Sequence, residues 1–366
     1  MTQTPGRMRL GLNLGYWGMG NDAENLALAR EADRLGYAVA WAAEAYGSDA
    51  VTVLTWVAAQ TERMDVGSAV LQIPARTAAM TAMTAATLDT LSGGRFRLGL
   101  GVSGPQVSEG WHGVRFEKPL GRTREYVEVV RMALRRETVR YEGDHITLPL
   151  PDGPGKALKL TVHPVRPEIP VYLAAVGPKN LELTGRIADG WLAIFFSPEH
   201  SAVSMEPLRA GRASRRAESD PPDGDSDLMQ GFDVVPTVPV VIGDDLDAAA
   251  APLRGYSALY IGGMGSKDKN FYNDLARRMG FDEAADEVQR LFLDRKHREA
   301  AEAVPADFID ATSLIGPRDR IRDRLAAYAE AGVTTLSIST FDATLDQRLH
   351  TLRTMAEVLD ESGLGA

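Results

Sequence analysis

Residues 80–100 read MTAMTAATLDTLSGGRFRLGL, a helical segment followed by a glycine pair and a short apolar run. A glycine can end a helix in the left-handed conformation because it has no Cβ to clash. The same order of helix, glycine and apolar run recurs in residues 26–41, 180–196 and 321–338. The apolar runs do not alternate with polar residues, which is typical of strands buried on both faces of a parallel sheet. The repeated unit therefore predicts an α/β fold.

Eight short apolar segments qualify as strands, and helical patterns separate most of them. Parallel strands that connect through helices can close into a (β/α)8 barrel, a fold that accommodates long insertions. We therefore predict a single barrel domain over residues 1–366, with a doubly wound open sheet as the alternative. The predicted strands are residues 8–14, 38–42, 66–72, 96–102, 171–174, 192–196, 234–242 and 335–339.

The chain is longer than a bare barrel requires, and we expect the additional residues in four insertions. One of them is predicted to form a proline-rich hairpin, and the last is largely helical. Because long insertions in a compact domain are often functional, we expect them to determine the choice of substrate. The predicted insertions are residues 104–121, 141–170, 197–231 and 262–316.

Composition excludes several classes of protein. The chain has 40 Lys and Arg against 50 Asp and Glu, a formal net charge of −10, and it lacks the basic run that nucleic-acid binding needs. It has no cysteine, and its histidines lack the spacing of a metal site, so we expect neither disulfides nor a metal centre. No signal peptide or membrane span is visible, so we expect a cytoplasmic protein with no membrane partner.

The segment 174–180, AAVGPKN, is a candidate anion site, which a chain of this net charge can form only with local positive potential. It connects a predicted strand to a helix, and Pro178 suits the first helical turn because its missing N–H is not needed there. The free amides of that turn attract anions, and Lys179 adds a positive charge. An ordinary helix start with a solvated lysine accounts for the same residues equally well.

The glycine motif of residues 99–104, GLGVSG, has two interpretations. After a strand, this spacing is found in dinucleotide-binding folds, where it opens a helix that binds a pyrophosphate. Here Pro105 follows directly, and the next helical pattern starts near Arg122. We therefore favour a barrel strand whose glycines allow a flat ligand to approach the backbone.

Proton-transferring candidates follow the second and fourth predicted strands. Glu44 and Tyr46 come after the second strand, and His112 lies in the first insertion. A carboxyl group beside an apolar pocket can have the raised pKa that acid–base catalysis uses. Glu44 is equally explained as a helix cap or surface charge, and His112 as a structural residue.

Two amide side chains are predicted to lie at the same end of the barrel. Asn13 ends the first strand, and Gln72 ends the third strand before Pro74. Barrel enzymes place their sites at the carboxyl ends of the strands. A strand end that is stopped by proline also explains Gln72 without any function.

Several of these segments resemble the bacterial luciferase-like superfamily. The resemblance rests on MRLGLNLGYWG from residue 8, VAWAAEAYGSD from residue 39, SGGRFRLGLGVSGPQ from residue 92, EGWHG from residue 109 and VGPKN from residue 176. It covers residues 8–196 and resumes near residue 307. The segments are most similar to the branch of oxidoreductases that use the deazaflavin coenzyme F420.

The resemblance implies a (β/α)8 barrel with F420 across the carboxyl-terminal mouth and, by family resemblance alone, a homodimer. It also implies a non-prolyl cis peptide beside the ring, at Leu71–Gln72 or Gln72–Ile73 by position. The phosphate would bind the amides of the VGPKN segment. The cofactor-binding residues implied in this way are Asn13, Leu71, Gln72, Ile73, Ser103, Gly104, Val176, Gly177, Pro178, Lys179 and Asn180.

The chain departs from the sugar-phosphate dehydrogenases of this branch. Those enzymes have His and Trp after the second strand and Glu directly after the glycines of the fourth strand. This chain has Ala45 after Glu44 and Pro105 after Gly104. We therefore do not expect sugar-phosphate oxidation, and our hypothesis assigns the proton transfer to Glu44, then Tyr46, then His112.

The sequence thus predicts an F420-dependent oxidoreductase that transfers a hydride to or from a C=C, C=N or C=O bond of a small organic substrate. An FMN-dependent luciferase-like monooxygenase is the first alternative, because a similar ring pocket would serve both cofactors. A barrel hydrolase, lyase or ligand-binding protein without redox chemistry is the second.

Overall fold

The computed structural model describes residues 7–166, 168–218, 227–265 and 269–366. Within these residues, eight parallel strands form the main sheet: β1 (Arg9–Gly15), β2 (Val39–Ala42), β3 (Asp65–Ser68), β5 (Phe96–Gly101), β8 (Val171–Ala174), β9 (Gly190–Ile194), β10 (Asp233–Ile242) and β12 (Thr335–Thr340). Pairing of β9 with β10 closes this sheet on itself. The predicted (β/α)8 barrel is confirmed.

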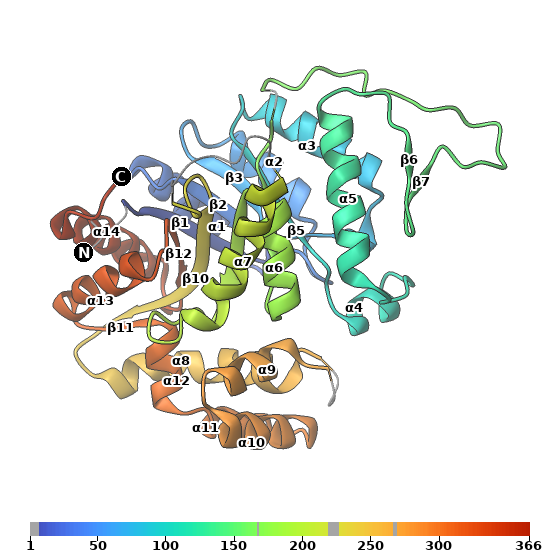
Figure 1. Cartoon of the computed structure of the whole chain (residues 1–366). Helices are drawn as coiled ribbons and strands as arrows, with labels where there is room; N and C mark the ends of the chain where they lie inside the picture. The colour runs from blue at the N-terminus through green and yellow to red at the C-terminus, as the bar shows by residue number, and fades with distance from the viewer. Residues whose placement is uncertain (1–6, 167, 219–226, 266–268) are drawn as a thin grey trace.

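Helices surround the barrel and connect successive strands (Figure 1). The last predicted helix is confirmed by α14, which starts at a capping box formed by Thr344 and Gln347. The surrounding helices are α1 (Asp22–Arg34), α2 (Ala50–Ala58), α3 (Ala78–Leu91), α5 (Pro119–Leu134), α6 (Pro178–Ile187), α7 (Ala202–Glu218), α13 (Arg318–Glu330) and α14 (Leu345–Ser362).

Three of the four glycines predicted to end helices do so. Gly36, Gly93 and Gly332 have φ angles of +82°, +70° and +94°. Gly190 was wrongly assigned this role, because it begins β9 without a positive φ. Its small size is needed for another reason: a Cβ there would lie 2.3 Å from the Tyr172 ring.

The third predicted strand is interrupted. β3 ends at Ser68, and a separate short strand, β4 (Leu71–Gln72), pairs with β5. A non-prolyl cis peptide between Ala69 and Val70 lies between the two strands. The position expected from the resemblance, at Leu71–Gln72 or Gln72–Ile73, is therefore wrong by two or three residues.

Aromatic side chains fill the interior of the barrel. Trp41 contacts Tyr172 edge to face, with ring centroids 5.2 Å apart. Gly67 makes room for Trp41, because a Cβ at Gly67 would lie 2.3 Å from its ring. Leu192 and Val235 complete the cluster. The barrel is therefore a packed core rather than a pore.

A buried charge network closes the amino-terminal end of the barrel. The Arg97 guanidinium binds Asp65 at 2.7 Å and Asp233 at 3.1 Å. Tyr172 and Thr335 donate further hydrogen bonds to Asp233, at 2.9 and 2.8 Å. Burial raises the pKa of the Tyr172 hydroxyl, as does the adjacent Asp233 charge, so the tyrosine stays protonated and donates.

The insertions contain short elements of their own. The predicted hairpin is present as β6 (Tyr141–Glu142) and β7 (Thr147–Leu148). Residues 104–121 hold a helix, α4 (Pro105–Gly110), directly after Gly104, so the expectation of no helix before Arg122 was wrong. The predicted insertion 197–231 includes residues 219–226, which lie outside the described residues.

The last insertion is helical, as expected, and packs around a second apolar cluster beyond the strand ends (Figure 1). A short strand, β11 (Leu314–Gly316), then pairs with the end of β10. In the part of the chain that the structure describes, no helix has the length and apolar character to cross a bilayer. The helical elements between β10 and β11 are α8 (Leu246–Ala258), the π-helix η2 (Leu259–Gly263), α9 (Phe271–Arg278), α10 (Asp282–Leu293), α11 (His297–Glu302) and α12 (Ala306–Thr312). The helical segment therefore starts before residue 262, the predicted start of the insertion.

The charge network generates a stability prediction. Arg97→Met should lower the free energy of unfolding by about 3 kcal/mol, because it removes the buried cation that Asp65 and Asp233 share and leaves only Arg9 paired with Asp233. Arg318→Met is the matched control: its ion pairs with Glu357 and Glu361 are exposed, and we expect a loss below about 1 kcal/mol. Urea unfolding followed by circular dichroism measures both, and equal losses would contradict the assigned role of Arg97.

Candidate functional site

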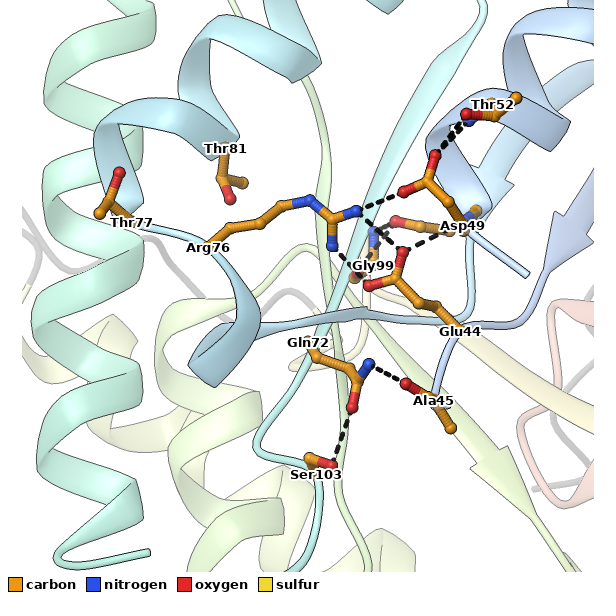
Figure 2. Close-up of polar contacts among 12 residues, drawn as sticks. Glu44, Ala45, Asp49, Thr52, Gln72, Arg76, Thr77, Thr81, Gly99 and Ser103 are labelled. Carbon is orange, nitrogen blue, oxygen red and sulfur yellow. Dashed lines mark hydrogen bonds and ion pairs between the residues drawn. The ribbon is translucent and has the colours of Figure 1, made fainter. Parts of the chain in front are cut away.

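Gln72 joins three strand ends at the carboxyl-terminal mouth of the barrel (Figure 2). Its Nε2 donates to the Ala45 carbonyl at 2.7 Å, beyond the end of β2. Its Oε1 accepts from Ser103 Oγ at 3.0 Å, beyond the end of β5. Ser103 has a φ of +61°, in the left-handed region that non-glycine residues seldom occupy. The structure therefore brings two of the predicted cofactor residues into direct contact.

The glycines of β5 serve the chain itself. A Cβ at Gly99 would lie 1.8 Å from the Ser68 carbonyl oxygen, and a Cβ at Gly101 would lie 2.4 Å from the Val70 side chain. Both glycines therefore make room for the segment around the cis peptide. These contacts explain Gly99 and Gly101 without a ligand, and the approach of a flat ligand to this strand stays a prediction. At Gly104 the nearest neighbour of a Cβ would be Gln106, at 3.7 Å.

Glu44 is bound by Arg76, a residue that the sequence did not single out. The two side chains form a two-pronged ion pair, with nitrogen–oxygen distances of 2.5 and 2.9 Å, and only 7% of the Glu44 side chain is exposed (Figure 2). Arg76 also binds Asp49 at 2.7 Å, and Glu44 accepts from the Ala50 amide at 3.1 Å. This geometry supports the start of α2 and fits a structural role for Glu44.

The charges of this cluster reinforce one another. The hydrogen bond and charge of Glu44 raise the pKa of Arg76. Burial opposes ionisation of Asp49, but hydrogen bonds from Thr52 and the charge of Arg76 outweigh it and lower its pKa. Arg76 and Asp49 are therefore both charged at neutral pH, as a lasting ion pair requires.

Tyr46 and His112 lie in different surroundings. Tyr46 is 66% exposed, and its neighbour Gly47 lies against the Tyr16 ring, which a Cβ at Gly47 would approach to 3.1 Å. His112 has a buried Nε2 with no hydrogen-bond partner among the described residues. Among those residues, no hydrogen bond connects His112 to Glu44 or Tyr46. The structure therefore does not join the three proton-transfer candidates into one cluster.

The VGPKN segment forms the predicted helix start. Gly177 is the N-cap of α6, and Pro178 is its first residue. The Asn180 amide donates to the Gly177 carbonyl at 3.0 Å, whereas Asn180 Oδ1 is buried and has no partner among the described residues. Asn180 Oδ1 is thus a buried acceptor that a donor on a bound ligand would satisfy, as expected for a binding loop.

A second cation lies at this segment. Arg278, in the last turn of α9, donates to the Val176 carbonyl at 2.8 Å. Burial lowers the pKa of Arg278 from its usual value, but an arginine remains charged. Together with Lys179 it gives an acidic protein a local positive potential beside free amides. The sequence offered no signal for Arg278, because nearly 100 residues separate it from the segment.

Asn13 is used by the protein itself. Its Oδ1 accepts from the Gly15 amide at 3.1 Å, and its Nδ2 lies 3.5 Å from Ser339 Oγ on β12. Leu71 and Ile73 are buried beside Gln72. Within the described residues, no group of three or more His, Asp or Glu is placed to bind a metal ion.

Residues 8–335 match the model of the luciferase-like monooxygenase family. This chain belongs to that family. The chain is 45% identical over 340 residues to "Putative coenzyme F420-dependent oxidoreductase Rv3520c" of Mycobacterium tuberculosis, with 91% of this chain and 95% of that protein covered. It is 28% identical to the 5,10-methylenetetrahydromethanopterin reductase of Archaeoglobus fulgidus over 309 residues, 83% of this chain and 85% of that enzyme.

A solved structure of this luciferase-like fold agrees with the barrel. The coenzyme F420-dependent tetrahydromethanopterin reductase of Methanopyrus kandleri superposes with a TM-score of 0.78 at 23% identity, over 96% of this chain and 98% of that one. The likeness shows a shared fold. The family resemblance seen in the sequence motifs is confirmed by the match of residues 8–335 to the family model.

The Glu44–Arg76 pair makes a prediction about stability. In a double-mutant cycle, Glu44→Gln and Arg76→Met should be non-additive, with a coupling of about 1–3 kcal/mol in the free energy of unfolding. The exposed pair Glu287–Arg290 is the control, for which we expect about 0.5 kcal/mol or less. Additive losses for Glu44 and Arg76 would show that the ion pair is not what holds these two side chains.

Proposed function

We propose that this chain is an F420-dependent oxidoreductase that transfers a hydride between the coenzyme and a small organic substrate. The observation that carries the proposal is the VGPKN helix start, where Lys179 and Arg278 place positive charge beside free amides. The 45% identical relative, whose name assigns it to F420, supports this choice of cofactor.

The residues present fit such a coenzyme. The amides of Gly177 and Lys179 would hold its phosphate, and a hydrogen-bond donor of the coenzyme would satisfy Asn180 Oδ1, which as an amide oxygen can only accept. Lys179 and Arg278 would attract the acidic tail of F420, which the net charge of −10 otherwise repels. Gln72 and Ser103 would position the ring end at the strand termini. When bound, F420 supplies two electrons as a hydride, and a proton completes the reduction of the substrate's double bond.

The proton donor is a separate part of the proposal. Glu44, Tyr46 and His112 are the three candidates. The ion pair with Arg76 occupies both oxygens of Glu44 and argues against it. Tyr46 is accessible, and His112 has an unpartnered ring nitrogen, so these two are favoured over Glu44.

FMN is the alternative cofactor, because a phosphate site does not distinguish it from F420. Purified protein should bind F420 at least about tenfold more tightly than FMN, as measured by fluorescence titration. Lys179→Met and Arg278→Met should each weaken F420 binding and reduce its salt dependence, since each removes a cation from the anion site. Arg290→Met on α10, which pairs with Glu287, is the control and should leave binding unchanged.

Each outcome of that titration has a meaning. Tighter binding of FMN would overturn the proposal in favour of a monooxygenase. Failure to bind either cofactor would favour a non-redox barrel enzyme or ligand-binding protein. If F420 binding is unchanged in both Lys179→Met and Arg278→Met, the phosphate does not bind at the VGPKN segment.

The candidates for proton transfer are separated by their pH profiles. Glu44→Gln should retain most of the turnover of F420-dependent reduction, with an unshifted pH profile, because Arg76 rather than substrate holds this carboxylate. At least one of the two variants, Tyr46→Phe or His112→Gln, should have its turnover reduced about 100-fold, because it loses the proton donor. Turnover rates measured between about pH 5 and about pH 9 test these expectations for the three variants. Loss of turnover in Glu44→Gln alone would restore Glu44 as the donor.

A further inference from the structure

Five tyrosines from separate parts of the chain gather at the mouth of the barrel. Tyr16 follows β1 and Tyr46 follows β2, whereas the other three lie in the segment between β10 and β11. We call this set the tyrosine wall. Its members are Tyr16, Tyr46, Tyr256 on α8, Tyr260 on η2 and Tyr272 on α9.

The three tyrosine rings from the segment between β10 and β11 form a contiguous cluster. The centroid of Tyr260 lies 4.9 Å from that of Tyr256 and 4.9 Å from that of Tyr272. Phe195, which directly follows β9 and is buried with a φ of +54°, contacts all three rings at 5.6 to 6.3 Å. Phe341, directly after β12, contacts Tyr256 at 5.3 Å. The wall is thus anchored to the strand ends of the barrel.

The position of the wall follows from the order of strands around the barrel. On the side of the wall, Phe195 follows β9, Phe341 follows β12, and Tyr16 and Tyr46 follow β1 and β2. On the side of the proposed cofactor, Gln72 ends β4, Ser103 follows β5 and Gly177 follows β8. In the closed sheet, β12 lies opposite β5, and β1 lies opposite β8. Most of the wall therefore faces the proposed cofactor residues across the mouth, where a substrate would have to lie.

Hydrogen bonds from α9 and its N-cap fix the backbone around Tyr260. Tyr260 belongs to a π-helix, a rare element that is frequent at functional sites. The Asn270 side chain donates to the carbonyls of Tyr260 and Ile261, at 3.0 and 2.8 Å. Asn273 donates to the Ile261 and Ala285 carbonyls, at 3.2 and 2.8 Å. Two buried asparagines thus satisfy the backbone that the π-helix leaves without regular partners.

The wall carries neutral hydroxyl groups. Burial, followed by the neighbouring Tyr260 and Tyr46, raises the pKa of Tyr16 to about 12. Burial also raises the pKa values of Tyr256, Tyr260 and Tyr272, and other tyrosines are the only ionisable neighbours that contribute. The hydroxyls of Tyr16, Tyr256, Tyr260 and Tyr272 are therefore protonated donors, and among the described residues no charged group contributes to these pKa shifts. An apolar substrate gains contacts with the rings, and the hydroxyls offer it neutral donors.

We propose that the tyrosine wall is the substrate-binding face of the mouth, that it takes an uncharged and mostly apolar carbonyl compound, and that Tyr260 and Tyr16 donate hydrogen bonds to the carbonyl oxygen. This inference rests on the proposed F420-dependent reduction. In that reaction a C–H bond forms at the carbonyl carbon and the C=O π bond breaks. The oxygen takes a proton from the proposed donor, Tyr46 or His112, which solvent then reprotonates, and oxidised coenzyme is the second product.

The test uses full-length protein, 2-cyclohexen-1-one as a neutral probe, and 3-oxocyclohexanecarboxylate as an anionic one. Reduced F420 is the co-substrate for rates, and saturation-transfer NMR follows probe binding to protein loaded with oxidised F420. Wild-type protein should bind and reduce the neutral probe in preference to the anionic one. Tyr260→Phe and Tyr16→Phe should each lower kcat/KM for the neutral probe about tenfold, the loss of one neutral hydrogen bond.

Tyr328→Phe is the matched control, because Tyr328 is buried on α13 and its hydroxyl has no partner within the described residues. It should leave both probe binding and kcat/KM unchanged. F420 affinity should stay within about twofold in all three variants, since within the described residues no hydrogen bond joins these three hydroxyls to the VGPKN segment.

The outcomes separate this inference from the proposed function. If F420 does not bind, the proposed function fails. If F420 binds but the anionic probe is preferred, or neither probe binds or reacts, the tyrosine wall is not a face for neutral carbonyl compounds. If the neutral probe reacts but the Tyr260 and Tyr16 variants match wild-type protein, the assigned hydrogen bonds are wrong.

Discussion

The pairing of β10 with both β9 and β12 is the constraint on which the site depends. It closes the sheet, and because all the strands are parallel, their carboxyl ends meet at a single mouth. Without closure, Gln72 on β4 and Phe195 after β9 would lie at separate places along an open sheet. The interior supports the same geometry, since Trp41 fills the barrel only because Gly67 leaves it room. Polar groups at the mouth therefore rest on a rigid, packed core.

Much of this barrel could be predicted, because its signals are local. Unalternating apolar runs identified all eight barrel strands, and glycines at positions 36, 93 and 332 marked true helix ends. The break after Ser68 could not be foreseen, since it depends on how Ser68 and Val70, on either side of residue 69, pack against the β5 glycines. α4 was missed because Pro105 and the loop-like composition around it hid a short helix.

The candidate site shows the same difference between residues with a local sequence signal and residues whose role depends on tertiary contacts. Gln72, Ser103 and the VGPKN segment were found because each follows a strand directly. Arg76 and Arg278 were not, because their importance comes from partners that only tertiary structure supplies. Glu44 shows the consequence. Its residue type suggested an acid, but a guanidinium bound to both of its oxygens changes which role the carboxylate can serve. Residue type indicates possible chemistry, and the partner decides between the possibilities.

Helix α9 links the two halves of the proposed site. Tyr272, in its first turn, belongs to the tyrosine wall, and Arg278, at its last residue, reaches the Val176 carbonyl beside the anion site. Asn270 caps the same helix and also holds the π-helix that carries Tyr260. A displacement of α9 would therefore move a cofactor cation and two substrate-facing rings together. The insertion thus couples the position of the coenzyme tail to the shape of the opposite wall, so its sequence can alter substrate choice without any change in the barrel.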